Sequence, residues 1–124
     1  DVVFDDRLME MNFGKFENRT IEEIKELFGE DLLRFRKDYV DFRVPKGESF
    51  SEVQDRVIEF IGELKAKKDN ETIVIVAHSL VIRAALSFLM NIPLREIRRF
   101  DIRPSGIVEI NSDGILSKII YPTT

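Results

Sequence analysis

The sequence predicts a single α/β domain in which helices pack on both faces of a largely parallel sheet. In residues 72–77 (TIVIVA), hydrophobic side chains occupy both alternating positions, as in strands that are covered on both faces. Strand and helical patterns also alternate along the chain, which is typical of this fold class. The 124 residues, 44% of them hydrophobic, are enough for one core and too few for two.

Local signals in the first half of the chain predict helices between loops. Thr20 and Glu23 form a capping box, which starts a helix that Gly29 ends. Pro45 and Gly47 mark a loop. The expected elements, in order, are a strand end at residues 2–4, a loop over 5–14, a helix over 21–28, a second helical stretch over 31–38 and a loop over 39–48.

The second half of the chain carries clearer patterns. Ser49 and Glu52 form another capping box, ahead of apolar residues at helical spacing. Residues 111–114 are a turn between two apolar runs, which predicts a hairpin. The expected elements are a helix to about residue 67, a turn over 68–71, the strand over 72–77, an apolar helix that stops before Pro93, and hairpin strands over 105–110 and 115–121.

The predicted strands are few for a sheet that is covered on both faces. A central strand needs hydrogen-bonding neighbours at both edges. The only candidates are residues 2–4, residues 73–77 and the hairpin. The chain also begins at Asp1 rather than at a methionine. We therefore expect a sheet that is short of strands, and a segment upstream of Asp1 that supplies them.

Composition and charge exclude several classes of protein. The 19 Lys and Arg residues against 23 Asp and Glu give a net charge of −4, which argues against nucleic acid or an anionic membrane surface as a partner. No apolar run approaches the ~20 residues of a membrane span. With no cysteine and one histidine, the chain offers no disulfide, thiolate zinc site or multi-histidine metal site. We expect a cytoplasmic protein.

His78 is the first candidate for chemistry, because it follows the buried strand and precedes a helix. Open α/β sheets bind ligands beyond the carboxyl ends of their strands. The free N–H groups and the positive dipole end of the next helix favour an anion there. His78, together with Ser79, is therefore a candidate for phosphate binding. In the alternative interpretation, His78 only caps the helix or satisfies a carbonyl group in the core.

Glu10 is the second candidate, because it lies among the apolar residues Leu8, Met9, Met11 and Phe13. Apolar neighbours favour the protonated carboxyl group, which can then donate a proton near neutral pH. In the alternative interpretation, Glu10 is a solvated residue of a mixed loop.

Three further acidic residues are weaker candidates. Glu48 is a candidate for the rim of a substrate pocket, although a tight turn into a capped helix also explains its segment. The neighbouring carboxylates of Asp5 and Asp6 are a candidate magnesium site, or else lie on a solvated loop. The sequence contains no Walker loop, dinucleotide fingerprint, zinc-protease helix or Gly-x-Ser-x-Gly elbow.

Four segments, taken together and in order, resemble the histidine phosphatase superfamily, whose fold is phosphoglycerate mutase-like. They are RLMEMNFGKFE at residues 7–17, PKGESF at 45–50 with Arg56 and Val57, IVAH at 75–78 with Ile82 and Arg83, and SGI at 105–107. The resemblance covers nearly the whole chain and implies a three-layer α/β/α sheet, seen as an incomplete C-terminal portion. Within the superfamily, the EMNFG stretch is most similar to α-ribazole phosphatases, which act late in cobalamin synthesis.

This resemblance implies roles for the candidate residues. Glu10 corresponds to the general acid that protonates the leaving oxygen, and His78 to the second active-site histidine, which binds the phosphoryl group. The nucleophile of the family is another histidine, in an Arg-His-Gly motif on the first strand, and no residue of this chain matches it. Ser79 stands where a glycine commonly follows the histidine, which restricts backbone approach to a phosphate.

The resemblance implies a phosphomonoesterase that acts through a phosphohistidine intermediate on a small phosphorylated metabolite, with α-ribazole 5′-phosphate as a candidate. One alternative is a mutase, which moves phosphate between two hydroxyl groups. Another, if the chain is complete as given, is a catalytically inactive domain that binds a phosphorylated ligand or a partner protein. The apolar hairpin is also compatible with edge pairing of two copies as a homodimer.

Overall fold

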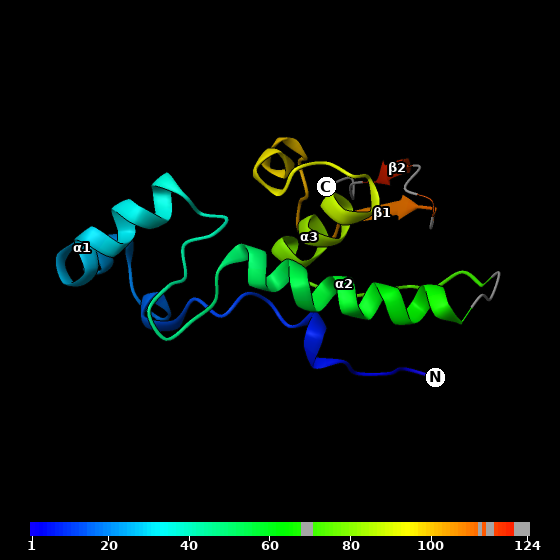
Figure 1. Cartoon of the computed structure of the whole chain (residues 1–124), viewed down its shortest axis with the longest axis horizontal. Helices are drawn as coiled ribbons and strands as arrows, with labels where there is room; N and C mark the ends of the chain where they lie inside the picture. Colours follow the sequence, from blue (N-terminus) through cyan, green and yellow to red (C-terminus); the bar gives the residue numbers. More distant parts are fainter. Residues whose placement is uncertain (68–70, 112, 114–115, 121–124) are drawn as a thin grey trace.

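The computed structural model describes residues 1–67, 71–111, 113 and 116–120. Its elements in chain order are the 3₁₀ helices η1 (Asp6–Leu8) and η2 (Gly14–Phe16), the α-helices α1 (Ile21–Lys37), α2 (Phe50–Ala66) and α3 (Ser79–Leu89), the 3₁₀ helix η3 (Leu94–Arg99), and the strands β1 (Ile107–Ile110) and β2 (Leu116–Ile120). Figure 1 shows α2 along the middle of the molecule, with α3 and the hairpin on one side of it and α1 at one end.

Helix α2 begins where its capping box predicts. Ser49 Oγ accepts a hydrogen bond from the Glu52 N–H at 3.2 Å, and Glu52 Oε1 accepts one from the Ser49 N–H at 3.1 Å. The two bonds satisfy N–H groups that have no partner within the helix. One face of the helix is apolar and enters the core through Phe50, Val53, Val57 and Ile61.

Helix α3 packs against α2, and the predicted apolar helix that stops before Pro93 is confirmed. A short polar chain joins the two helices inside this contact. Gln54 Nε2 donates to Ser87 Oγ at 3.1 Å, and Ser87 Oγ donates to the carbonyl oxygen of Ile92 at 2.6 Å. Because Ser87 is buried, these bonds satisfy a hydroxyl group that has lost its contact with water.

The 3₁₀ helix η3 follows Pro93 and was not predicted from the sequence. Its residues Leu94 and Ile97 lie in the core, and η3 packs against α3. Among the helices of the described residues, none combines the length and the apolar character that crossing a bilayer requires.

The two helical stretches predicted over residues 21–28 and 31–38 form one helix, α1, which is kinked where the break was predicted. Phe28, with φ −137° and ψ 44°, interrupts the helix just before Gly29. Ile24 lies before the kink and Leu32 after it, and both side chains are buried. The kink therefore lets both halves of α1 contribute to the core.

The strands predicted at residues 2–4 and 72–77 are wrong for the described part of the chain. Residues 71–78 connect α2 to α3 without a ladder partner among the described residues. Val74 is 84% exposed and Val76 88% exposed, and Phe4 is 93% exposed. The apolar pattern fits burial on both faces, but a strand forms only where neighbouring strands accept its backbone hydrogen bonds.

The predicted C-terminal hairpin is confirmed by the antiparallel pairing of β1 with β2, in which Ile107 lies opposite Ile120. Residues 112 and 114 of the predicted turn and residues 115 and 121 of the predicted second strand lie outside the described residues, as do residues 68–70 of the turn predicted after α2.

Candidate functional site

The Glu10 loop (residues 10–14) and the adjoining Lys15 are attached to the segment before α2 by three hydrogen bonds. The Lys15 N–H donates to the Pro45 carbonyl oxygen at 2.9 Å, and the Glu48 N–H donates to the Asn12 carbonyl oxygen at 2.8 Å. The Glu48 carboxylate adds the third bond, because its Oε1 accepts from the Asn12 N–H at 2.9 Å. Two segments that are distant in the sequence therefore form one structural unit.

Arg56 of α2 also binds both segments of this unit. Its Nε donates to Glu48 Oε2 at 2.9 Å and its Nη2 to Glu48 Oε1 at 3.0 Å, in a bidentate pair. The guanidinium also binds two backbone carbonyl groups, which lie on either side of Leu8 and Met9. Nη1 donates to the Arg7 carbonyl oxygen at 2.6 Å, and Nη2 donates to the Glu10 carbonyl oxygen at 3.4 Å. Arg56 thus links the Glu10 loop to a helix of the core.

Both carboxylate oxygens of Glu48 are occupied by these bonds. Burial raises the pKa of Glu48, but the hydrogen bonds from Arg56 and Asn12 and the Arg56 charge outweigh it and hold the pKa below its ordinary value. The predicted place of Glu48 at a substrate-pocket rim stays a prediction. What the structure shows is a carboxylate that binds the Glu10 loop to α2.

Replacing Arg56 with methionine is expected to destabilise the protein by about 2 kcal/mol at pH 7, because the partly buried Glu48 carboxylate loses its partner. Because the pKa of the Glu48 carboxyl group is lower in the folded protein, the ionised carboxylate stabilises the fold at pH values above the unfolded-state pKa. This stabilisation is lost as the pH falls through the folded-state pKa. The difference from the original protein should therefore shrink at about pH 3. Urea denaturation at both pH values measures it, with the exposed Arg36→Met as control. Equal losses at the two pH values would contradict this role of Glu48.

Gly14 brings the Glu10 loop close to the segment before α2. Its φ is +50°, a region that favours glycine, and an added Cβ would overlap the Pro45 carbonyl oxygen. Gly47 is its counterpart across the contact, where an added Cβ would overlap the Asn12 carbonyl oxygen. The two loops therefore approach each other more closely than side chains would allow.

Gly14→Ala is expected to lower the free energy of unfolding by about 3 kcal/mol, through backbone strain and steric overlap. Gly62→Ala is the matched control, because Gly62 lies within α2 and an added Cβ there meets nothing within 4 Å. The control should be neutral or stabilising by about 0.5–1 kcal/mol. Thermal or urea unfolding of the two variants provides the comparison. A Gly14→Ala protein as stable as the control would show that the close approach is not required.

Asp5 and Asp6, the candidate magnesium ligands, lie at η1. Asp5 Oδ1 accepts from the Arg7 N–H at 2.9 Å, and its Oδ2 accepts from Arg7 Nη2 at 2.7 Å. The side-chain hydrogen bond from Arg7 lowers the pKa of Asp5 to about 2. Arg7 in turn binds Glu63 of α2 through two hydrogen bonds, so Asp5 takes part in anchoring η1 to α2. Within the described residues, no group of three His, Cys, Asp or Glu side chains is arranged to hold a metal ion.

Glu10 itself is partly exposed, and its Oε1 accepts a hydrogen bond from the Met11 N–H at 2.9 Å. Of its apolar neighbours, Met11 is buried and Met9 is exposed. The Glu10 backbone is fixed by Arg56, while its second carboxylate oxygen has no hydrogen bond to a described residue. This oxygen is available to a ligand.

His78 is the N-cap residue of α3, with φ −92° and ψ 166°. Its side chain makes no capping hydrogen bond, and the residue is exposed. Neither a cap nor a buried carbonyl therefore explains the imidazole. Ser79 Oγ accepts a hydrogen bond from Arg83 Nη1, and Arg83 Nη2 donates to the Phe100 carbonyl oxygen at 3.0 Å. The start of α3 thus carries free N–H groups, an exposed imidazole and a nearby guanidinium, a combination suited to an anion.

The structure therefore joins the predicted site residues in two groups. Glu10 and Glu48 are linked through Arg56. His78 and Ser79 lie together at the start of α3. No hydrogen bond or ion pair connects the two groups among the described residues, and their convergence on one ligand stays a prediction.

The chain combines a loop that carries a carboxyl group with an exposed histidine at the start of a helix. These features are typical of a known class of protein. Residues 1–118 match the model of the histidine phosphatase superfamily (branch 1), and the chain belongs to that family. It is 29% identical over 100 residues to phosphoserine phosphatase 1 of Hydrogenobacter thermophilus, covering 81% of this chain and 47% of the relative. It is 32% identical over 103 residues to a 6-phosphofructo-2-kinase/fructose-2,6-bisphosphatase of Arabidopsis thaliana, covering 83% and 14% respectively.

The expected fold class is confirmed by a solved structure. The crystal structure of the alpha-ribazole phosphatase from Shigella flexneri matches with a TM-score of 0.79 at 24% identity, over 94% of this chain and 58% of that one. The chain spans about half the length of several of the proteins it matches, and its described residues hold the helices and the hairpin of an incomplete phosphoglycerate mutase-like domain.

Proposed function

We propose that the protein to which this chain belongs is a phosphomonoesterase that acts on a small phosphorylated metabolite. The observation that supports the proposal most is the exposed imidazole of His78, which precedes α3 at its N-cap position and makes no capping hydrogen bond. An imidazole next to free helical N–H groups can donate hydrogen bonds to the oxygens of a phosphoryl group. Membership of the histidine phosphatase superfamily supports the same chemistry.

Phosphate monoesters hydrolyse extremely slowly, and their enzymes reach accelerations of about 10²¹. In the proposed reaction, a second histidine from outside these 124 residues attacks phosphorus. A P–N bond forms as the P–O bond to the alcohol breaks, and Glu10 gives its proton to the departing oxygen. His78 stabilises the charge on the non-bridging oxygens during this step.

The second half of the reaction regenerates the enzyme. The Glu10 carboxylate takes a proton from water, and the water oxygen attacks phosphorus. The P–N bond then breaks, which releases inorganic phosphate and restores the protonated Glu10. No step in this scheme needs a metal or an organic cofactor.

α-Ribazole 5′-phosphate is the first substrate to test, because the solved structure of an alpha-ribazole phosphatase shares the fold of this chain. The full-length protein, incubated with this compound and a panel of phosphorylated metabolites, is expected to release inorganic phosphate from at least one. Isomerisation without phosphate release would indicate a mutase. Binding without either reaction would indicate an inactive domain, and both results would contradict the proposal.

A further inference from the structure

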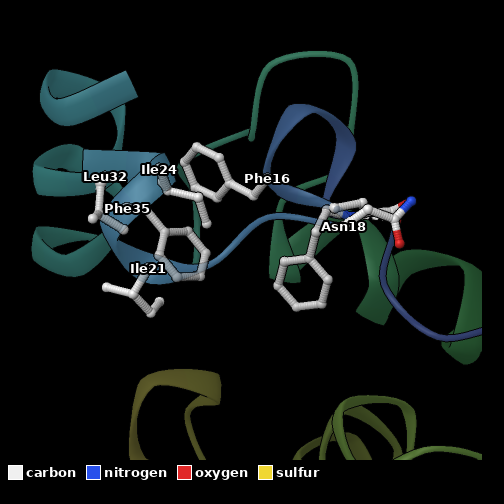
Figure 2. A pocket seen from close by; sticks show the side chains of 8 residues that line it. Phe16, Asn18, Ile21, Ile24, Leu32 and Phe35 are labelled. Carbon is white, nitrogen blue, oxygen red and sulfur yellow. Dashed lines mark hydrogen bonds between the residues drawn. The ribbon is translucent and has the colours of Figure 1, made fainter. Parts of the chain in front are cut away.

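An open apolar pocket of about 370 Å³ lies between η2 and α1. In Figure 2, the rings of Phe16 and Phe35 approach each other from these two elements, with aliphatic side chains of α1 around them. Phe13, from the Glu10 loop, contributes a third ring. The volume is in the usual range for a small-molecule site, about 300–1,000 Å³.

The three rings form a fixed aromatic wall. Phe13 and Phe35 lie 6.5 Å apart between ring centroids with an interplanar angle of 71°, and Phe16 and Phe35 lie 6.0 Å apart at 88°. Ile24 and Leu32, each 5% exposed, complete the apolar lining from both halves of α1. Aromatic rings that pack edge to face restrict one another's movement, so this set of rings is suited to bind a flat aromatic group of a ligand.

Two polar residues also line this pocket. Glu17 Oε1 accepts a hydrogen bond from the Phe13 N–H at 3.0 Å, which fixes the carboxylate beside the rings. Asn18 has a left-handed backbone, with φ 59°, and also lines the pocket. The lining contains no lysine or arginine, and its one charge is negative. A phosphate group is therefore disfavoured here, whereas a neutral organic group is not.

The pocket is close to the proposed proton donor along the chain. Phe13 and Glu10 are three residues apart in a loop that is fixed by Glu48 and Arg56. Three residues of chain span roughly 10 Å at most. The alcohol oxygen that Glu10 protonates is bonded directly to the organic part of the ester, so this part lies next to the loop that carries Phe13.

We propose that this pocket holds the organic part of the substrate, and that this part is an aromatic or heteroaromatic group. The inference rests on the proposed phosphomonoesterase function and adds the substrate class to it. The phosphate binds at His78, and the aromatic group lies among Phe13, Phe16 and Phe35. The carboxylate of Glu17 and the amide of Asn18 accept hydrogen bonds from the edge of the ring system.

The test uses the full-length protein and two esters with comparable primary alcohol leaving groups, 2-phenylethyl phosphate and propyl phosphate. The original protein is expected to show at least about tenfold higher kcat/KM for the phenylethyl ester. Phe35→Ala should remove most of this preference, which the ratio of the two kcat/KM values measures. Leu33→Ala is the matched control, because Leu33 is a neighbouring, exposed residue of α1 that does not line the pocket.

A second variant tests the same inference if Phe35→Ala fails to fold. Ile21 lines the pocket and is 49% exposed, so Ile21→Trp can fill the space with little cost to the core. It should lower kcat/KM for the phenylethyl ester selectively, by about tenfold. Equal kcat/KM values for the two esters in the original protein would overturn the inference.

A binding measurement separates this inference from the proposed function. Saturation-transfer NMR with 2-phenylethyl phosphate should show contacts of the phenyl ring with the original protein and their loss in Ile21→Trp. Ring contacts without hydrolysis would support the pocket while contradicting the phosphatase. Hydrolysis without ring contacts would do the reverse. If Phe35→Ala instead converts a dimer to a monomer in analytical ultracentrifugation and leaves selectivity unchanged, the pocket is an interface between copies and the inference is wrong.

Discussion

Replacing Glu10 with glutamine in the full-length protein is expected to slow the hydrolysis of alkyl phosphates by about 10²–10⁴-fold, with little change in substrate binding. An amide cannot give a proton to the departing oxygen, and alkoxides leave poorly without one. An ester with an acidic alcohol needs less help, so the loss should be much smaller for p-nitrophenyl phosphate. The ratio of kcat values for the two kinds of ester measures this difference.

Glu26→Gln is the matched control for Glu10→Gln, because Glu26 is an exposed glutamate of α1. Its replacement removes the same charge outside the Glu10 loop. The structure also predicts that Glu10→Gln folds normally, since Arg56 holds the backbone carbonyl of residue 10 and not its side chain. Unchanged turnover of a poor leaving group would remove Glu10 from the role of general acid.

Replacing His78 with alanine is expected to lower kcat/KM by about 10²–10³-fold and to weaken inhibition by inorganic phosphate and vanadate. In the proposed mechanism, the variant loses a hydrogen-bond donor to the phosphoryl oxygens, whose charge grows in the transition state. Steady-state kinetics with vanadate as inhibitor measures both effects. Full vanadate inhibition of the variant would count against His78 as the oxygen-binding residue.

The stability of His78→Ala distinguishes this role from a structural one. His78 is exposed and its side chain makes no cap for α3, so the variant should unfold within about 0.5 kcal/mol of the original protein. Loss of a real N-cap would cost about 1 kcal/mol. A variant that loses both activity and stability would point to a helix cap after all.

Local chemistry in the sequence predicted much of the fold. The Ser49–Glu52 capping box located the start of α2, because the residues that satisfy its first N–H groups are adjacent in the chain. Gly29 located the kink of α1 to within one residue. The hairpin also followed from its turn and its flanking apolar runs. Each of these features depends on interactions between residues that are near one another in sequence.

Features that depend on distant residues could not be predicted in the same way. Residues 72–77 have the composition of a buried strand, but whether they form one depends on neighbouring strands, and the described residues provide none. Arg56 was noted only within a family motif, whereas the structure shows it binding Glu48 and the backbone at Arg7 and Glu10.

For Glu10 and His78, the sequence indicated the residue types and the structure adds their surroundings. The backbone of Glu10 is fixed, and the imidazole of His78 is exposed at a helix start. Both findings are conditions for a shared phosphate site, and the remaining condition is that the two side chains reach the same ligand.

A crystal structure of the full-length protein with vanadate tests this last condition most directly. We expect a vanadate oxygen within hydrogen-bond distance of the His78 imidazole, and the Glu10 carboxyl group beside the oxygen that stands for the departing alcohol. A vanadate ion bound elsewhere, with Glu10 and His78 on opposite sides of the molecule, would contradict the account.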